Sequence, residues 1–570
     1  MSVLSEKVSR SPAAAGRTHG IGSEASSLPP VWLGLLTALG VAVVFTLIVV
    51  HWSLEHGRLS TLANWDDSMY LAHGWIGSAT LEEKGLIKFL GFERSWPPHS
   101  IYSDLQCMAG FLLFGFQDSS PYYFGFVSVT AALVLLGMLA RWQPVATGTT
   151  WLLFLATPMA FQMVHMVKAD VACGVWFVMG AALLLDGDLI SMPLWELGFR
   201  LVPFFVAVLC RPPGLIYLGP LFAACWGIAW GREWLTLRAD GKCLPWPAAF
   251  KRFLMPGVAL VLLAPYYLFA YRWFQGYLLD AYLHRAWYSP PRPLWEELGY
   301  YFEPRIYNDA TGIAIAIGIG TCIGLVVAAL RSREQNLRAT AWFWCASTGI
   351  AWIGLTVAYY KTPLIGSTFY LFLFCALPIL WSRLRSGAGR TLAGAVVFAG
   401  FLFVASHTQW SNPDEWYGGG RTDPRTRILG AASTRVVEIA RDACLQRAGS
   451  NLAAISHSLK VNVFFTSDAF LNAENFEYEM AKAGYWKVHA LGLDFSADLE
   501  EHVAEARKAD LVIACDGGAN WPYPGNRPAD RLQDAVLAVL KADPQFLVLG
   551  ETPSIGGKSF YVFQNLQRTK

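Results

Sequence analysis

The stretch VWLGLLTALGVAVVFTLIVV, residues 31–50, has no formal charge over twenty consecutive positions. About twenty mostly apolar residues form a helix long enough to cross the hydrocarbon core of a bilayer. The pattern extends to the whole chain, since 54% of its 570 residues are hydrophobic and only 15% are charged. Soluble domains carry about 25% charged residues. The sequence therefore predicts a polytopic membrane protein, and its net charge of +2 gives no support for a nucleic-acid partner.

Ten windows without a formal charge are candidate membrane spans. They are Val31–Val50, Tyr122–Ala140, Ala146–Met166, Val171–Leu185, Pro212–Trp230, Phe253–Tyr271, Thr311–Leu330, Ala339–Tyr360, Thr362–Trp381 and Thr391–Ser406. An eleventh, about Met192–Cys210, is weaker because Glu196 and Arg200 lie in its first half, from where they can snorkel to the interface. With about eleven transmembrane helices and a cytoplasmic N-terminus, most loop arginines face the cytoplasm, as the positive-inside rule requires. Without the weak span this sorting is lost.

The topology divides the chain into three parts. Residues 1–30 are expected to form a disordered cytoplasmic tail, residues 31–406 the transmembrane domain, and residues 407–570 an outer-face domain. The first outer loop, residues 51–121, contains the apolar stretch Pro98–Phe116. We interpret that stretch as an interfacial helix, because a span there would invert every later loop.

The C-terminal part returns to a soluble level of charge, with strand and helix patterns in alternation. The expected strands are Val461–Phe465, Lys487–Ala490, Leu511–Cys515 and Phe546–Leu549, and the expected helices are Glu474–Ala483, Leu499–Lys508 and Ala529–Lys541. Such alternation predicts an α/β domain with a largely parallel sheet.

Five short polar clusters fall on the outer side of this topology. They are Asn64–Tyr70 with Asp66 and Asp67, Phe92–His99 with Glu93 and Arg94, Lys168-Ala169-Asp170, Cys210–Gly214 with Arg211, and Tyr359–Pro363 with Lys361. Each alone has a structural interpretation as a helix N-cap, a surface ion pair or an interface anchor. Carboxylates also act as general bases or metal ligands, and arginines bind phosphate. Their presence on one face favours a reaction on an anionic lipid substrate.

The order and spacing of these clusters resemble glycosyltransferase family 39 of the GT-C superfamily, which includes bacterial lipid A aminoarabinose transferases and protein O-mannosyltransferases. The resemblance covers about residues 31–400. Three motifs depart from the family pattern. The acidic pair is Asp66-Asp67 where Asp-Glu is usual, and the Thr-Lys-Gly-Pro hairpin appears as Cys210–Gly214. The Glu-Lys-Pro-Pro motif appears as Glu93-Arg94, with Ser95-Trp96 inserted before Pro97-Pro98. These departures indicate a divergent branch.

The resemblance implies a GT-C fold and an inverting glycosyltransferase that moves a sugar from a polyprenyl-phosphate donor to an acceptor hydroxyl at the outer face. Because the leaving group is a phosphate anion, the reaction needs a base and a phosphate clamp but no general acid, unlike a glycosidase. Asp66 matches the family's first acidic residue and is the candidate base. The other expected site residues are Asp67 and Asp170 near the reaction, Arg94, Arg211 and Lys361 on the donor phosphate, and Tyr70, Glu93, His99, Lys168, His284 and Arg285 around sugar or acceptor.

The resemblance further implies a glycolipid, polysaccharide or protein acceptor, contact with membrane lipids and a bacterial inner membrane with the C-terminal domain in the periplasm. No particular cofactor follows from the resemblance, and the carboxylate pair is also able to hold a divalent metal. For His284 and Arg285 an ordinary interfacial helix remains the alternative.

Two other functions fit parts of the sequence. A transporter or flippase of lipid-linked sugars has similar composition, but such proteins tend to have half-repeats with broken helices at the midplane. A membrane-anchored sensor would use the C-terminal domain, where the loop Cys515–Asn520 follows a strand.

Overall fold

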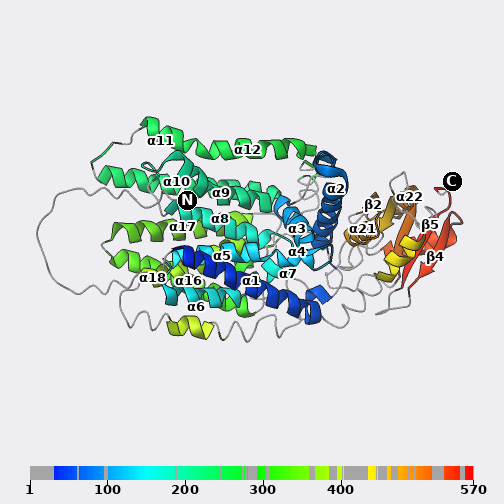
Figure 1. The fold of residues 1–570 in the computed structure, drawn as a ribbon, viewed down its shortest axis with the longest axis horizontal. Coiled ribbons are helices and arrows are strands. Elements are labelled where there is room, and N and C mark those ends of the chain that lie inside the picture. Colours follow the sequence, from blue (N-terminus) through cyan, green and yellow to red (C-terminus); the bar gives the residue numbers. More distant parts are fainter. Residues whose placement is uncertain are drawn as a thin grey trace, which may run out of the picture.

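The computed structural model describes residues 31–568 apart from several gaps. The gaps are residues 61–62, 64, 96–99, 186–188, 240, 244–245, 273–274, 277–278, 280–291, 303–308, 333, 358–365, 384–393, 401, 403–433, 444–445, 447–458, 464–472, 486, 492–495, 517–531 and 553–558. The described residues form an elongated helical bundle and a smaller domain with a five-stranded sheet at one end of it (Figure 1). The expected tail 1–30 lies outside them, and of the window Thr391–Ser406 only residues 394–400 and 402 lie within them.

The bundle consists of helices that follow the apolar windows of the sequence. They are α1 (Val31–His56), η1 (Arg58–Ser60), α2 (Trp65–Ser95), α3 (Ile101–Phe114), α4 (Ser120–Tyr123), α5 (Phe126–Leu139), α6 (Pro144–Leu155), α7 (Pro158–His165), α8 (Asp170–Leu185), α9 (Leu194–Cys210), η2 (Pro212–Gly214), α10 (Leu215–Ala239), α11 (Trp246–Phe253), α12 (Met255–Phe269), α15 (Leu294–Gly299), η3 (Tyr300–Phe302), α16 (Asp309–Arg331), α17 (Gln335–Val357) and α18 (Ser367–Arg383).

Four stretches among the described residues are long and apolar enough to cross a membrane, or five if α7 and α8 form one broken span. The four are Val31–His56, Ser120–Leu139, Pro212–Leu235 and Ala249–Leu268. The expected number of about eleven spans is therefore not confirmed. Shorter apolar helices, including α6 and α18, account for part of the difference.

One expected span is wrong in shape. The window Ala146–Met166 was expected to be a single helix, but it forms α6 and α7 with a break before Pro158. Proline lacks the N–H that a continuous helix needs and is favoured at the first turn of a new one. α7 then meets α8 at an angle of 116° across a short break. This bend places Lys168 and Asp170 where the chain turns.

The first loop is more helical than its sequence indicated. The stretch Pro98–Phe116 contains the expected helix, α3, whose N-cap Ser100 accepts a hydrogen bond from the Ser103 N–H at 3.1 Å. Before it runs α2, a 31-residue helix that the sequence did not predict, interrupted at Gly85, where φ is 77°. α2 carries the acidic pair in its first turn.

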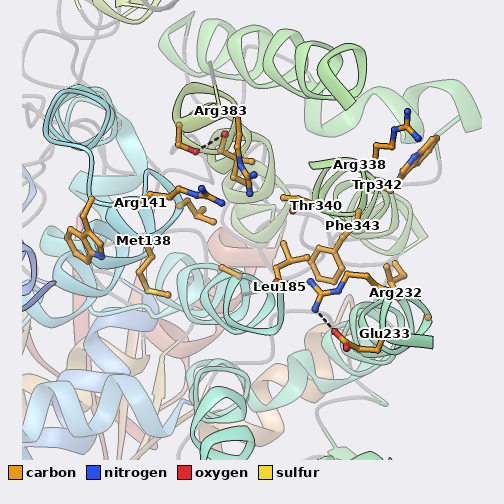
Figure 2. Close-up of a pocket in the computed structure, with 18 of the residues that line it drawn as sticks. Met138, Arg141, Leu185, Arg232, Glu233, Arg338, Thr340, Trp342, Phe343 and Arg383 are labelled. Carbon is orange, nitrogen blue, oxygen red and sulfur yellow. Dashed lines mark hydrogen bonds and ion pairs between the residues drawn. The ribbon is translucent and has the colours of Figure 1, made fainter. Parts of the chain in front are cut away.

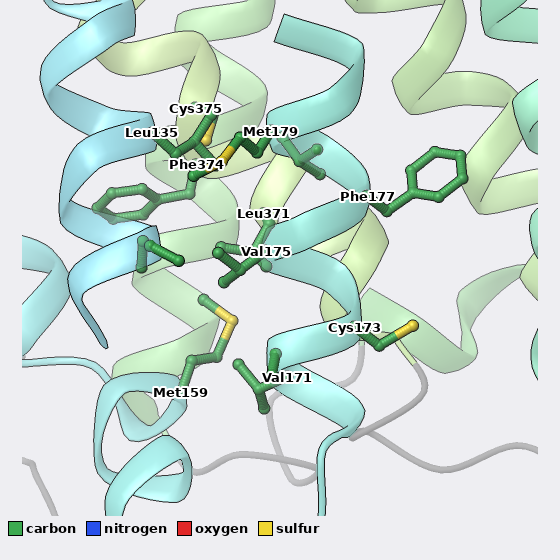
Figure 3. Packing of buried hydrophobic residues seen from close by; sticks show 14 of the residues in the cluster. Leu135, Met159, Val171, Cys173, Val175, Phe177, Met179, Leu371, Phe374 and Cys375 are labelled. Atoms are coloured by element: carbon green, nitrogen blue, oxygen red, sulfur yellow. The ribbon is translucent and has the colours of Figure 1, made fainter. Parts of the chain in front are cut away.

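The core of the bundle is centred on α8, which α5, α9 and α18 surround (Figure 3). Thirteen of the sixteen residues of α8 are buried, and aromatic rings link its neighbours. The ring of Phe177 lies 5.0 Å from that of Phe204 on α9 and 6.4 Å from that of Phe372 on α18. Edge-to-face pairs at these distances add to the stabilisation from apolar burial. The ends of α8 are thus held at fixed positions.

The C-terminal domain has a mixed sheet of order β2-β1-β3-β5-β4. Its strands are β1 (Leu459–Val463), β2 (Val488–Leu491), β3 (Leu511–Cys515), β4 (Phe546–Glu551) and β5 (Phe560–Asn565), and its helices α21 (Ala473–Lys482), α22 (Leu499–Lys508) and α23 (Gln533–Ala542). The expected strands run in one direction, but the sheet is mixed because β5 was missed and lies antiparallel between β3 and β4. β1, β2 and β3 pair in parallel, and β4 runs in the same direction because β3 and β4 are both antiparallel to β5.

α21 joins the C-terminal domain to the bundle by packing on α2 (Figure 1). The Tyr478 hydroxyl donates to Asp118 Oδ1 at 2.8 Å, and Lys482 Nζ lies 2.9 Å from Asp118 Oδ2. The ring of Tyr478 also lies 6.2 Å from that of Trp75 on α2. The first loop and the C-terminal domain therefore share one end of the bundle, the end at which the polar clusters of the sequence were expected to meet.

Candidate active site

Asp67 lies in a buried ion pair at the start of α2. Its side chain is 1% exposed, and Arg58 Nη2 donates to Oδ2 at 2.6 Å. The Tyr122 hydroxyl donates to the same oxygen at 3.3 Å, and Arg58 Nη1 donates to the carbonyl oxygen of His165 at 3.3 Å. The pair thus ties α2 to η1, α4 and the end of α7. A buried carboxylate needs such partners because desolvation of an unpaired charge costs several kcal/mol.

A second cluster forms around Asp170, the first residue of α8. Its carboxylate forms an ion pair with Arg211, and Lys168 Nζ lies 3.8 Å from Oδ2. The Ser367 hydroxyl, at the start of α18, donates to the Asp170 carbonyl oxygen at 2.8 Å. The side chains of Asp170 and Arg211 are only 3% and 10% exposed. In such surroundings a charge interacts more strongly than in water.

Local sequence explains why these charges meet. α9 ends at Cys210, with Arg211 as its C-cap, because Pro212 cannot continue the helix. The Ser100 hydroxyl, the N-cap of α3, donates to the Cys210 carbonyl oxygen at 2.7 Å. Asp170 at the N-terminus of α8 also interacts favourably with the helix dipole. Helix ends from three parts of the chain are therefore fixed around one ion pair.

The two clusters flank the bend between α7 and α8. Arg58 contacts the backbone of His165, and Lys168 and Asp170 follow within five residues. One short segment thus connects the Asp67–Arg58 pair to the Asp170–Arg211 pair. The arrangement combines carboxylates and cations at one end of the bundle, which suits an anionic substrate.

The remaining expected residues are placed only in part. Tyr70 is buried in the core beside the first cluster, at 2% exposure. The backbone of Asp66 lies in the first turn of α2, and Glu93 and Arg94 lie at its end, but their side chains are outside the described part of the chain. The other expected residues, His99, His284, Arg285 and Lys361, lie wholly outside the residues described.

Arg58 and a third buried pair were not predicted from the sequence. His73 Nδ1, on α2, lies 2.9 Å from Asp104 Oδ2, on α3, and both side chains are at most 5% exposed. The close approach of the helices depends on Gly74, where an added Cβ would lie 2.4 Å from the Cβ of Cys107. Asp104 carried a usable signal, because it is a carboxylate inside an apolar stretch. Arg58 is the first cation after the first span.

Within the described residues, no group of three or more His, Cys, Asp or Glu side chains is gathered as metal ligands. The side chains of Asp66 and Glu93 lie outside those residues. A divalent metal at the acidic pair therefore stays a prediction.

The bundle, the charged end and the docked sheet domain define a class of fold that two solved structures share with this chain. The expected resemblance in fold is thereby confirmed, and the expected number of spans is not. The particular structures are those of ArnT from Cupriavidus metallidurans. The form bound to undecaprenyl phosphate matches with a TM-score of 0.50 and 14% identity, over 93% of this chain and 98% of that one. The apo form gives 0.50 and 15%, over 93% and 97%.

An oligosaccharyltransferase from Archaeoglobus fulgidus in its apo form is more distant, with a TM-score of 0.46 and 11% identity over 86% of this chain and 70% of that one. No family model and no curated protein sequence matches the chain. The similarity to ArnT at these identities shows the fold, and the chemistry has to be argued from the residues.

Proposed function

We propose that this chain is a membrane glycosyltransferase that transfers a sugar, with inversion, from a polyprenyl-phosphate donor to an acceptor hydroxyl. The observation that supports it best is the buried cluster of Lys168, Asp170 and Arg211 beside the Asp67–Arg58 pair, in a bundle with the fold of ArnT. One ArnT structure is bound to undecaprenyl phosphate, which belongs to the class of lipid proposed here as the carrier.

In this proposal Arg211 binds the leaving phosphate. Asp170 orients its guanidinium, and burial to 10% exposure keeps it largely desolvated. Charge-assisted hydrogen bonds from arginine to phosphate are strong in such a site. Lys168 supplies a second cation beside the same carboxylate. Arg94 and Lys361 complete the proposed clamp, and Lys361 precedes Ser367, which contacts Asp170, by six residues.

Asp66 is the proposed base. It takes the proton from the acceptor hydroxyl, whose oxygen attacks the anomeric carbon while the bond from that carbon to the phosphate oxygen breaks. The electron pair stays on the phosphate, so no acid is needed. Arg58 and Tyr122 both donate hydrogen bonds to the carboxylate of Asp67. Asp67 is therefore better suited to hold the start of α2 than to accept a proton. Glu93, Tyr70, His99, His284 and Arg285 are proposed to position sugar and acceptor.

The decisive experiment compares outer-face glycans, lipids and proteins by mass spectrometry in cells with and without the gene. We expect one sugar mass to disappear from one acceptor class in the deletion strain and to return with the wild-type gene. Purified protein in vesicles should then release polyprenyl phosphate from the lipid-linked sugar. A transporter or flippase would move the donor across the vesicle membrane with its glycosidic bond intact, and that result would overturn the proposal. The same assay with EDTA tests the divalent metal.

The proposal includes a location in a bacterial inner membrane, with a cytoplasmic N-terminus and a periplasmic C-terminal domain. A single cysteine is placed at Ser554 or at Ser5 in a variant without other cysteines. Its reaction with a membrane-impermeant maleimide tests this orientation. Labelling in intact spheroplasts is expected at position 554 alone.

A further inference from the structure

A second charged region lies at the opposite end of the bundle. It is a cavity of about 1360 Å³ with walls from α1, α5, α8, α10, α17 and α18 (Figure 2). α8 begins at Asp170 in the candidate active site and ends at Leu185 in the wall of this cavity. At 1.5 Å per residue these ends lie about 22 Å apart along the helix. The two sites therefore lie near opposite surfaces of a bilayer whose hydrocarbon core is about 30 Å thick.

Four arginines from four parts of the chain line the cavity. They are Arg141 after α5, Arg232 on α10, Arg338 on α17 and Arg383 on α18. One carboxylate is present, that of Glu233, and it lies 2.6 Å from Arg232 Nη2. The described lining thus has three more positive than negative charges.

Arg141 owes its place to an uncommon backbone conformation. Arg141 and Trp142 have φ values of 56° and 53°, a left-handed conformation that non-glycine residues seldom adopt in succession. The Trp142 N–H closes the turn by donating to the Gly137 carbonyl oxygen at 2.8 Å. Figure 2 shows the Arg141 side chain extending toward that of Arg383. Its guanidinium has no hydrogen bond or ion pair to any residue that the structure describes.

Two guanidinium groups directed toward the same space create a positive potential that attracts an anion, and a phosphate can accept hydrogen bonds from both. The rest of the wall is mainly apolar and includes Met138, Phe343 and Ile379. Val31 and Leu35 of α1 border the cavity and are exposed on the surface of the bundle. A matching ligand has a phosphate at one end and hydrocarbon at the other.

We propose that this cavity binds an anionic phospholipid of the adjoining leaflet, with its phosphate between Arg141 and Arg383 and an acyl chain along the apolar wall. Basic pockets between membrane helices bind such headgroups in other proteins. The positive-inside rule explains why arginines occur at this end, but it does not require them to converge on a cavity. Arg331, at the end of α16, is exposed and is not among the lining residues, so it is the matched control.

Native mass spectrometry of the full-length protein from micelles with equal phosphatidylglycerol and phosphatidylcholine tests the site. We expect phosphatidylglycerol to be retained at least fivefold over phosphatidylcholine. Arg141→Gln and Arg383→Gln should each lower that ratio threefold or more, while Arg331→Gln leaves it unchanged. Equal retention of both lipids by the wild-type protein overturns the proposal, and so does an equal loss in Arg331→Gln.

A second measurement separates a lipid site from a phosphate site. Thermal unfolding of the wild-type protein is followed with added phosphatidylglycerol or with inorganic phosphate at the same concentration. We expect Tm to rise by several degrees with the lipid only, because the apolar wall contributes to its binding. A rise of equal size with inorganic phosphate overturns the lipid assignment. Neither wild-type measurement depends on the folding of a variant or on transferase activity.

Discussion

Asp66 and Asp67 are adjacent in the sequence, and we expect their removal to have different effects. Asp66→Asn should abolish transfer and leave folding and lipid binding largely intact, because it removes the proposed base and keeps the size of the side chain. The comparison measures the initial rate with the lipid-linked donor and the Tm of each variant. Near wild-type turnover by a purified Asp66→Asn protein would show that Asp66 is not the base.

Asp67→Asn is the matched variant, and we expect it to act on stability. It leaves Arg58 in a buried site without its carboxylate partner, and loss of one member of a buried ion pair costs about 3–5 kcal/mol. Tm in detergent should fall clearly below that of Asp66→Asn. The double variant Arg58→Gln/Asp67→Asn should lose less than the sum of the two single variants, and additive losses would contradict the coupling.

The Asp170–Arg211 pair allows stability and chemistry to be separated. Arg211→Ala leaves Asp170 with Lys168, 3.8 Å away, as the nearest remaining cation of the cluster, so we expect both a lower Tm and a loss of transfer of about 100-fold. Adding Asp170→Asn removes the buried carboxylate that lost its arginine partner and should restore much of the Tm without restoring the rate. Recovery of both would show that Arg211 acts only through folding.

At the scale of elements, the sequence predicted some boundaries closely and others not at all. Leu499–Lys508 and Leu511–Cys515 were expected as they are found. The first has the spacing of an amphipathic helix, and the second is an apolar run between Asp510 and Asp516. β5 was missed although residues 560–563 form an apolar run, because a run of four residues is too short to identify a strand without its partners, β3 and β4. The formation of this strand depends on its pairing with β3 and β4 in the folded domain.

The candidate site, too, could be predicted from the sequence only in part. The clusters around Lys168-Asp170 and Arg211 were found from charges beside apolar spans, a pattern that is costly without a function or a partner. Their pairing was not predictable, because 41 positions separate Asp170 from Arg211. Arg58 was passed over because a cation just after a span is ordinary by itself.

α21 provides a test of pH dependence. Burial raises the pKa of Glu477 from 4.5 to about 8, although its carboxylate accepts a hydrogen bond from the Ala490 N–H at 2.9 Å. The folded protein therefore holds a proton that the unfolded chain releases, and stability falls as pH rises from about 4.5 to 8. From this pKa difference, the fall attributable to Glu477 is at most about 5 kcal/mol.

Glu477→Gln keeps the side-chain oxygen as an acceptor and removes the titration, so we expect a flatter Tm profile between pH 5 and 8. Burial also raises the pKa of Glu479, which leaves part of the slope in the variant. Hydrogen exchange of β2 amides locates the effect in the domain. An unchanged profile would mean that Glu477 ionises without cost in the folded protein.

For the whole molecule, the question is what the C-terminal domain contributes. Every side chain placed in the two charged clusters comes from the bundle. α21 contacts α2 through Tyr478, and its Asn475 donates to the carbonyl oxygen of Ala63, which precedes α2. We expect truncation after residue 415 to lower transfer about 10- to 100-fold by loosening α2, without abolishing it. Complete loss in a truncated protein with a normal elution profile would place essential residues in the domain.

α18 begins at Ser367, against the candidate active site, and ends at Arg383, in the arginine-lined cavity. Its seventeen residues measure about 25 Å, and nearly all of them are buried. This rigid helix sets the spacing between the two polar surfaces of the protein. Reconstitution in bilayers of increasing acyl-chain length should therefore lower transfer once the membrane becomes too thick, because hydrophobic mismatch would draw one charged end into hydrocarbon.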